Sequence, residues 1–234
     1  MSLVSLRNEI KSVSNPDKAK FLQRFFKTGK GEYAEGDVFL GIVVPVQRQI
    51  AKKYKELSFI ELKVLITSKY HEERLIALLI LVERFKKADE NEKEIIVKFY
   101  LDNRKGINNW DLVDLSAPKI LGQYLIDKDR KILFRFAKSN DLWAKRIAVL
   151  STFAFIRNND FEDALKIYEI LVNDKHDLIH KAVGWMLREL GKIDLKEEEE
   201  FLKKHYKTMP RTMLRYAIEK FPERKRKAYL EGRI

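Results

Sequence analysis

Residues 181–192, KAVGWMLRELGK, carry apolar side chains with the period of an α-helix. They recur at i, i+3, i+4 and i+7, which places them on one helix face. The same period occurs in ERLIALLILVERFKK (73–87) and DALKIYEILVN (163–173), each with charged residues on the opposite face. No convincing pair of strands is present, so the sequence predicts an all-α chain.

Capping residues support these helices. Gly106 and Gly191 stand where helices are expected to end. The one long irregular segment is GKGEYAEGDVFLGIVVP (29–45), in which VFLGIVV is strand-like but has no partner run. We therefore expect an ordered loop there, with Gly41 and Pro45 in conformational roles. Helix starts are predicted at Pro16-Asp17, Ser58, Asn140-Asp141 and Asp177.

Helix-borne alanines recur at a nearly constant spacing. Ala148 and Ala182 are 34 residues apart, and Ala182 and Ala217 are 35 apart. Ala77 precedes Ala148 by 71 residues, so a further unit should centre near Leu112. Because an amphipathic helix precedes each unit, the pattern predicts an α-solenoid of HEAT-like helical repeats with a concave basic groove, forming a single domain over residues 1–234. An irregular helical bundle is the alternative.

The stretch NNWDLVD (108–114) lies in this register. Trp110 and Asp114 are four residues apart and share one helix face. We call the recurring alanines and Leu112 the anchors. The residues two positions before the anchors form a column that we expect to line a groove, and a lining of cations and aromatic rings suits a nucleic-acid backbone. A carboxylate weakens phosphate binding, so Asp114 should have another task, and this favours catalysis. The column reads Leu75, Trp110, Arg146, His180 and Arg215.

Composition limits the class of protein. The 47 Lys and Arg residues exceed the 35 Asp and Glu residues, which gives a net charge of +12 and predicts a polyanionic partner or an anionic membrane. No apolar run approaches the roughly 20 residues that span a bilayer, and the charged N-terminus is no secretory signal. The absence of cysteine excludes disulfides and thiolate chemistry and fits an intracellular protein. We expect a cytoplasmic protein, associated with the nucleoid if the source is prokaryotic.

Five blocks together resemble the AlkD-like DNA alkylation repair family of HEAT-like-repeat DNA glycosylases. The resemblance extends from about residue 8 to residue 221. It implies a solenoid that holds duplex DNA on its concave face and excises positively charged N3- and N7-alkylated purines, and thus a hydrolase acting in base excision repair. The blocks are GEYAEGDVFLGIVVPVQRQIAKKY (31–54), NNWDLVD (108–114), DLWAKRIAVL (141–150), HKAVGWMLRE (180–189) and PRTMLRYAIEKF (210–221).

The resemblance also assigns site residues. Asp114 matches the catalytic carboxylate, Trp110 the aromatic beside the deoxyribose, Arg146 the motif arginine, and Trp185 a second aromatic wall. A structural reading stays open for each: Asp114 as a cap or ion-pair partner, Trp110 and Trp185 as core residues, Arg146 as a bridge between repeats. Asp111 points about 100° away from Trp110 on a helix and is the weaker carboxylate. Further DNA-contact candidates are Lys145, Lys181, Arg188, Arg211, Arg215, Tyr33 and Arg48, although Tyr33 could instead pin its loop and Arg48 lie on a solvated face.

The chemistry needs only one carboxylate. Breaking an N-glycosidic bond builds oxocarbenium-like charge on the sugar, and a cationic alkylpurine leaves neutral without a general acid. We expect the protein to work as a monomer and without a cofactor. No metal site is expected either, because His176 and His180 have i, i+4 spacing but no accompanying ligand pattern. Two other hypotheses are a non-catalytic DNA-binding repeat protein that recognises distorted or branched DNA, and a protein-binding scaffold.

Overall fold

The computed structural model describes all 234 residues as α-helices joined by loops and short 3₁₀ or π turns, without a β-strand. The all-α class predicted from the sequence is confirmed. Contacts divide the chain into two compact units, Met1–Ser116 and Ala117–Ile234. The prediction of a single domain over residues 1–234 stays a prediction. Unit 1 contains α1 (Leu3–Ser12), α2 (Pro16–Phe25), α3 (Val44–Lys53), α4 (Phe59–Ile66), α5 (His71–Phe85), α6 (Glu90–Asp102), η1 (Arg104–Gly106) and α7 (Trp110–Ser116). Unit 2 contains η2 (Pro118–Gly122), α8 (Lys131–Ala137), α9 (Leu142–Ile156), α10 (Glu162–Leu171), α11 (Asp177–Gly191), α12 (Leu195–His205), α13 (Arg211–Ala217), η3 (Ile218–Lys220) and α14 (Glu223–Leu230).

Helix α5 is the centre of unit 1, and α3, α4, α6 and α7 all pack against it. Its middle, residues 75–82, is almost completely buried. The expectation that its charged residues face solvent is wrong for the first turn, because Glu73 and Arg74 are each only 4% exposed. Glu73 is paired with Arg7 of α1 at 2.9 Å, and Arg74 with Asp37 of the α2–α3 loop at 2.6 Å. Segments remote in sequence therefore cover a face that helical periodicity assigns to solvent.

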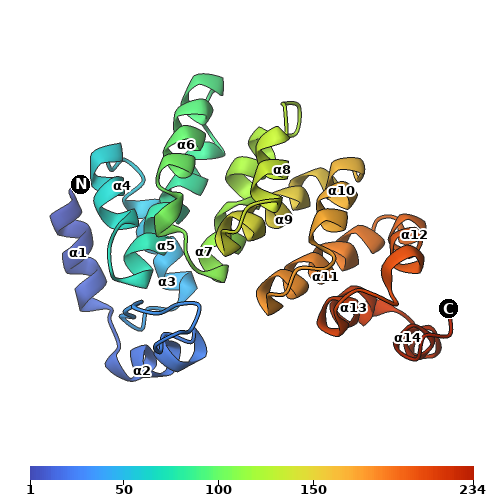
Figure 1. Cartoon of the computed structure of the whole chain (residues 1–234). Coiled ribbons are helices and arrows are strands. Elements are labelled where there is room, and N and C mark those ends of the chain that lie inside the picture. Colours follow the sequence, from blue (N-terminus) through green and yellow to red (C-terminus); the bar gives the residue numbers. More distant parts are fainter. The chain divides into compact units, whose positions relative to one another are not determined.

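The α2–α3 loop is ordered and contains no strand, as predicted (Figure 1). Its β-type pairing is a single isolated parallel bridge between Val38 and Tyr70. The buried carboxylate of Glu72 accepts hydrogen bonds from the backbone amides of residues 40–42 at 2.8 to 3.2 Å. A charge-assisted set of this kind fixes the loop to the start of α5.

Gly41 is required at the turn of this loop. Its φ of +82° lies in the left-handed region that favours glycine. A Cβ at this position would stand 2.0 Å from the carbonyl oxygen of Asn15, the residue that caps α2. The conformational role predicted for Gly41 is therefore confirmed.

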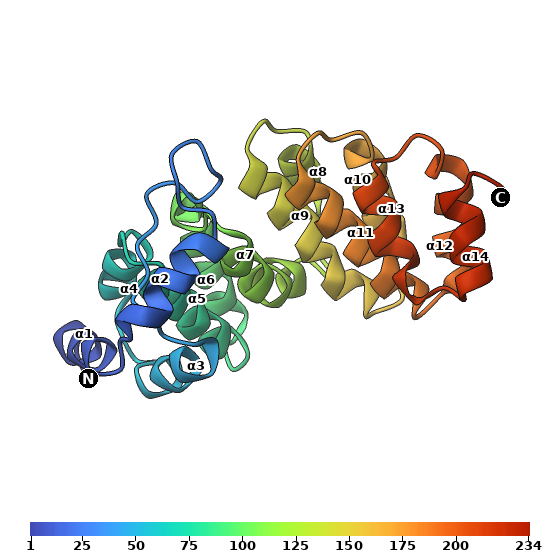
Figure 2. The same cartoon turned by 90° about the horizontal axis from the view of Figure 1, so that it is seen from below.

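Unit 2 is a stack of helix pairs. Helix α11 packs against α9 on one side and α13 on the other, and Figure 2 shows the three helices side by side. Helices α8, α10 and α12 pack against this row. Gly184 allows α11 and α13 to approach closely, since a Cβ there would lie 2.4 Å from the carbonyl oxygen of Met213. This is the arrangement of helical repeats that the sequence predicts.

The alanine register is confirmed, because every anchor lies on the second helix of a pair and is 0% exposed. The residues two positions before the anchors, which were expected to line a groove together, differ in burial. Leu75 is 0% exposed and belongs to the core of unit 1, while Arg215 is exposed. The prediction that all five positions line a groove is wrong for Leu75, because α5 is covered on all sides. The anchors are Ala77, Leu112, Ala148, Ala182 and Ala217.

None of the helices combines the length and the hydropathy that a membrane-spanning helix needs.

Candidate active site

Helix α7 begins at the stretch that the sequence analysis singled out. Asn109, immediately before it, is completely buried, and its Oδ1 accepts the backbone N–H of Trp110 at 2.8 Å. The side-chain amide of Asn109 donates to Asp37 Oδ2 at 3.2 Å. Leu112 and Val113 are fully buried, whereas Trp110 and Asp114 are only partly buried. The helix therefore presents one face to the core and carries the indole and the carboxylate together on another face.

The Trp110 indole rests on aromatic side chains from α2 and the residue that follows it. Its ring stacks on Phe26 with centroids 5.0 Å apart and an interplanar angle of 11°. Phe25 meets the same indole edge-on at 6.0 Å. These contacts fix the plane of the indole and keep one of its faces apolar.

Asp114 lies one turn after Trp110. It is partly buried, and it is near enough to the buried Tyr100 to affect that phenol's ionisation. Desolvation is the main cause that raises the pKa of Tyr100, and the Asp114 charge raises it further, while a hydrogen bond to Ser116 opposes the shift. A buried neutral phenol beside Asp114 adds no positive charge to the environment of the carboxylate.

Asp111 has a different role from Asp114. It is 7% exposed, and its Oδ2 lies 2.8 Å from Nε2 of His71 on α5. The other ring nitrogen of His71 lies 3.1 Å from Oδ2 of Asp37, whose Oδ1 pairs with Arg74. We call this set the ionic cluster: Asp37, His71, Arg74, Asn109 and Asp111. Because Asp111 is held inside it, the weaker standing that the sequence analysis gave this carboxylate agrees with the geometry.

Tyr33 and Arg48 also belong to unit 1. Tyr33 is partly buried in the α2–α3 loop. Arg48 is partly buried on α3. The pKa of Glu83 is lowered mainly by Lys86, against the opposing effect of desolvation, and the charges of Lys52 and Arg48 lower it further. The DNA contacts of Tyr33 and Arg48 stay predictions.

Arg146 and Trp185 belong to unit 2. Arg146 on α9 is 5% exposed and donates from Nη1 to the carbonyl oxygen of Leu178 at 2.6 Å, which is the bridge between repeats that the sequence left open. Trp185 on α11 is partly buried, and its indole N–H donates to Glu189 Oε1 at 3.1 Å. The Arg146 guanidinium and the Trp185 indole are thus each oriented by a partner within unit 2. Their roles beside a DNA lesion stay predictions.

The other basic candidates of unit 2 fall into two groups. Lys145 is paired with Asp174 at 2.6 Å, Lys181 with Asp177 at 2.7 Å, and Arg188 with Glu219. Arg211 and Arg215 on α13 are exposed. An ion pair must be exchanged or rearranged when a lysine moves to a phosphate, so the exposed arginines are the stronger candidates for direct phosphate contact.

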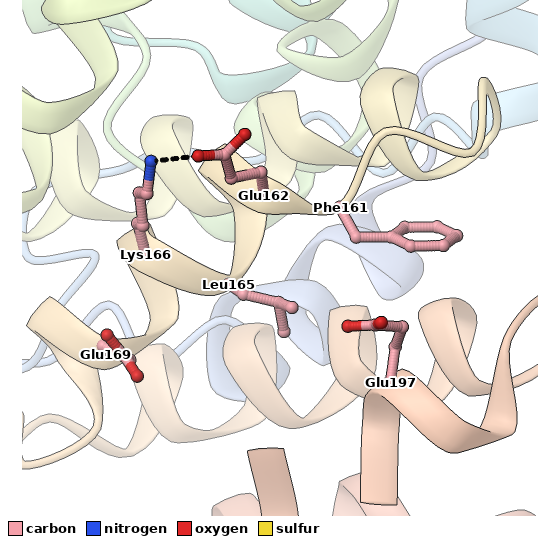
Figure 3. A pocket seen from close by; sticks show the side chains of 6 residues that line it. All are labelled: Phe161, Glu162, Leu165, Lys166, Glu169 and Glu197. Atoms are coloured by element: carbon pink, nitrogen blue, oxygen red, sulfur yellow. Dashed lines mark hydrogen bonds and ion pairs between the residues drawn. The ribbon is translucent and has the colours of Figure 1, made fainter. Parts of the chain in front are cut away.

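Surface pockets of unit 2 differ in charge. A pocket of about 400 Å³ lies between α10 and α12, and Lys166 is paired there with Glu162 at 2.6 Å. Figure 3 shows the side chains that line it. Its remaining carboxylates disfavour phosphate, and none of the predicted site residues lines it. A second pocket of about 470 Å³ includes Lys145 and lies where α9 and α11 begin. The first pocket is lined by Phe161, Glu162, Leu165, Lys166, Glu169 and Glu197.

His176 and His180 take part in structural hydrogen bonds. Nδ1 of His176 accepts the backbone N–H of Leu178 as the cap of α11, and Nε2 of His180 bonds to the carbonyl oxygen of Asp174 at 2.5 Å. No group of His, Asp and Glu side chains has the arrangement of a metal site.

With this geometry in view, comparison with known proteins identifies the family. A family model described as "DNA alkylation repair enzyme" matches residues 6–221. The chain belongs to the DNA alkylation repair enzyme family. The resemblance to its AlkD-like members, noted in the sequence, is confirmed. No curated protein sequence matches the chain.

A solved structure shares the fold of this DNA alkylation repair family member. It is a predicted DNA alkylation repair enzyme from Enterococcus faecalis, and it matches with a TM-score of 0.69. The match covers 90% of this chain and 97% of that chain, at 17% sequence identity. At this identity the similarity establishes the fold.

Sequence reasoning missed His71, which lies at the centre of the ionic cluster. The available signal is the run HEER (71–74), four ionisable residues directly before the apolar stretch LIALLILV. An unpaired charge at the start of a buried helix is costly, so such a run predicts partners elsewhere in the chain. Those partners, Asp37 and Asp111, are 34 and 40 residues away from His71.

Proposed function

We propose that this chain is a DNA N-glycosylase that hydrolyses the glycosidic bond of positively charged alkylpurines in duplex DNA. The observation that carries the proposal is the pair on α7: an indole held flat on Phe26, followed one turn later by a partly buried carboxylate. Membership of the DNA alkylation repair family supports the same reaction class. The remaining chemistry follows from what the substrate itself supplies.

In the proposed reaction, the bond between C1′ of the deoxyribose and the purine nitrogen breaks, and the electron pair leaves with the base. An N3- or N7-alkylated purine is cationic, so it departs neutral and needs no general acid. The oxygen of a water molecule then bonds to C1′, and the proton that this water loses passes to solvent. Asp114 stabilises the oxocarbenium-like charge and orients this water, since fixed charges are a large source of catalysis.

The aromatic side chains exclude water from this reaction. Trp110, supported by Phe25 and Phe26, packs against the sugar in the proposal, which strengthens the field of Asp114 in a drier environment. Its ring face also attracts a cationic nucleotide. Arg146 would hold the phosphate next to the lesion, and Trp185 would form the second aromatic wall. No metal or cofactor is needed for these steps.

The primary test is incubation of the full chain with methylated duplex DNA, followed by chromatography of the released bases. We expect 7-methylguanine or 3-methyladenine to be released, and DNA that contains uracil or oxidised guanine to be a poor substrate. Salt-dependent binding without any base release would contradict the glycosylase proposal and favour a non-catalytic DNA-binding protein. Base release in the presence of a chelator would support a metal-free reaction.

The exposed arginines of α13 give a prediction about binding. Arg215→Ala should weaken binding to undamaged duplex DNA and reduce the slope of log K against log salt concentration by roughly 1, because one phosphate contact with its released counterion is lost. Fluorescence anisotropy across a salt series measures the slope. Lys131→Ala is the matched control, since Lys131 is exposed on α8 and pairs with Asp129. An unchanged slope in Arg215→Ala would remove this residue from the DNA interface.

A further inference from the structure

His71 connects three segments of unit 1 that are distant in sequence. It stands at the start of α5, is 1% exposed, and bonds to Asp37 of the α2–α3 loop and to Asp111 in the first turn of α7. The charged groups that face it are these two carboxylates and Arg74 of its own helix. Its remaining ring contacts, with Phe26 after α2 and with Phe39 of the loop, are aromatic. The Phe26 ring also meets all three segments, through Phe39, His71 and Trp110, but it carries no charge and makes no hydrogen bond to them.

The imidazole also belongs to a group of contacting rings, in which it meets both Phe39 and, at 5.1 Å, Phe26. His71 stacks on Phe39 at 4.4 Å, and Phe39 stacks on Phe26 at 4.8 Å. Phe26 in turn stacks on Trp110 at 5.0 Å. We call these four rings the aromatic column. The position of the Trp110 indole therefore depends on His71 by two routes, through Asp111 of its own helix and through the stacked rings.

The two carboxylates keep the imidazole charged. Burial alone lowers the pKa of His71, but the charge and hydrogen bond of Asp111 and the hydrogen bond of Asp37 outweigh it and raise this pKa to about 9. An imidazolium donates from both nitrogens, whereas a neutral ring has one donor and one acceptor. At neutral pH His71 can thus hold both carboxylates, and above about pH 9 it can donate to one of them only.

We propose that His71 is a positioning residue of the candidate site, which fixes the first turn of α7 and the aromatic column so that Trp110 and Asp114 keep their places. The inference rests on the proposed function for its catalytic consequence. His71 does not touch the substrate in this scheme. A misplacement of the reacting groups by about 1 Å can cost on the order of 100-fold in rate, so the placement of α7 matters for catalysis.

The first test follows Trp110 itself and needs no activity. Carbon-bound ring protons of labelled His and Trp are recorded by NMR across a pH series, with His71→Gln and Trp110→Phe used to assign the two resonances. We expect His71 to be charged near pH 7, and both resonances to shift together with a midpoint near pH 9. Titration of His71 near its ordinary value, or a Trp110 resonance that ignores it, would overturn the proposal.

The second test separates positioning from a merely structural role. His71→Gln should lower the single-turnover rate of base release by roughly 10- to 100-fold, while the Kd for undamaged DNA changes by less than about twofold. His205→Gln, an imidazole substitution in unit 2 that leaves α7 untouched, is the matched control. An unchanged rate in folded His71→Gln, or a rate and an affinity that fall together, contradicts the proposal.

Stability gives a third readout with a defined sign. A folded-state pKa above the unfolded value means that the stabilisation by His71 is complete below about pH 6.5 and is lost as the pH rises through about 9. The unfolding equilibrium constant of the wild type should therefore rise by on the order of 100-fold across this window, and that of His71→Gln should not. If the wild type releases no base, the proposed function fails while the NMR series still decides the role of His71. If His71→Gln does not fold, the wild-type series decides alone.

Discussion

Asp114→Asn should slow the single-turnover release of 7-methylguanine from methylated duplex DNA by on the order of 100- to 1,000-fold. Asparagine has nearly the same shape but lacks the negative charge that stabilises the oxocarbenium-like sugar. Binding to undamaged DNA should remain similar or become tighter, because a negative charge next to phosphates is removed. The measurement is quenched-flow or manual single-turnover excision with chromatography of the bases, alongside fluorescence anisotropy for the Kd.

The control for this result is Asp102→Asn. Asp102 ends α6, is exposed, and pairs with Lys98 on the surface, so its substitution should leave the excision rate unchanged. Circular dichroism spectra that match the wild type would exclude a folding defect in Asp114→Asn. If folded Asp114→Asn excises at the wild-type rate, the catalytic assignment of Asp114 is wrong.

Asp37→Asn should reduce the free energy of unfolding by about 3–5 kcal/mol, since removing one partner of a buried ion pair leaves the other charge uncompensated. Asp37 is 4% exposed and pairs with both Arg74 and His71. For a chain of this size the loss corresponds to a decrease in Tm on the order of 10 °C. Urea unfolding followed by circular dichroism, together with thermal melts, measures both quantities.

An exposed ion pair provides the contrast for this prediction. Asp129→Asn removes the partner of Lys131 on the surface, where water and salt screen the pair and it contributes little to stability. Burial raises the pKa of Asp37, but the hydrogen bond from His71 and the charge of Arg74 outweigh it and hold that pKa below its usual value. The stabilisation by Asp37 is therefore present at neutral pH and lost as the pH falls through its lowered pKa. Equal stability losses in the two variants would show that the ionic cluster does not stabilise unit 1.

Much of the fold could be predicted from the sequence. The helical period of residues 73–87, 163–173 and 181–192 and the alanine spacing gave the helix pairs and their register, because both depend on intervals of a few residues or on a repeat that the chain itself displays. The α2–α3 loop was recognised as irregular from its glycines. The burial of Glu73 and Arg74 was not predictable in this way, since periodicity describes one helix and not what covers it.

For the candidate site, the sequence by itself determined that Trp110 and Asp114 share one face of a helix, because four residues make about one turn. Only the tertiary structure decided which carboxylate of α7 is held inside the protein. Asp111 meets His71 from α5, and Asp37 comes to the same imidazole from the α2–α3 loop. A buried charge is stable only with partners, and partners that lie 34 and 40 residues away are brought together by folding and by no local pattern.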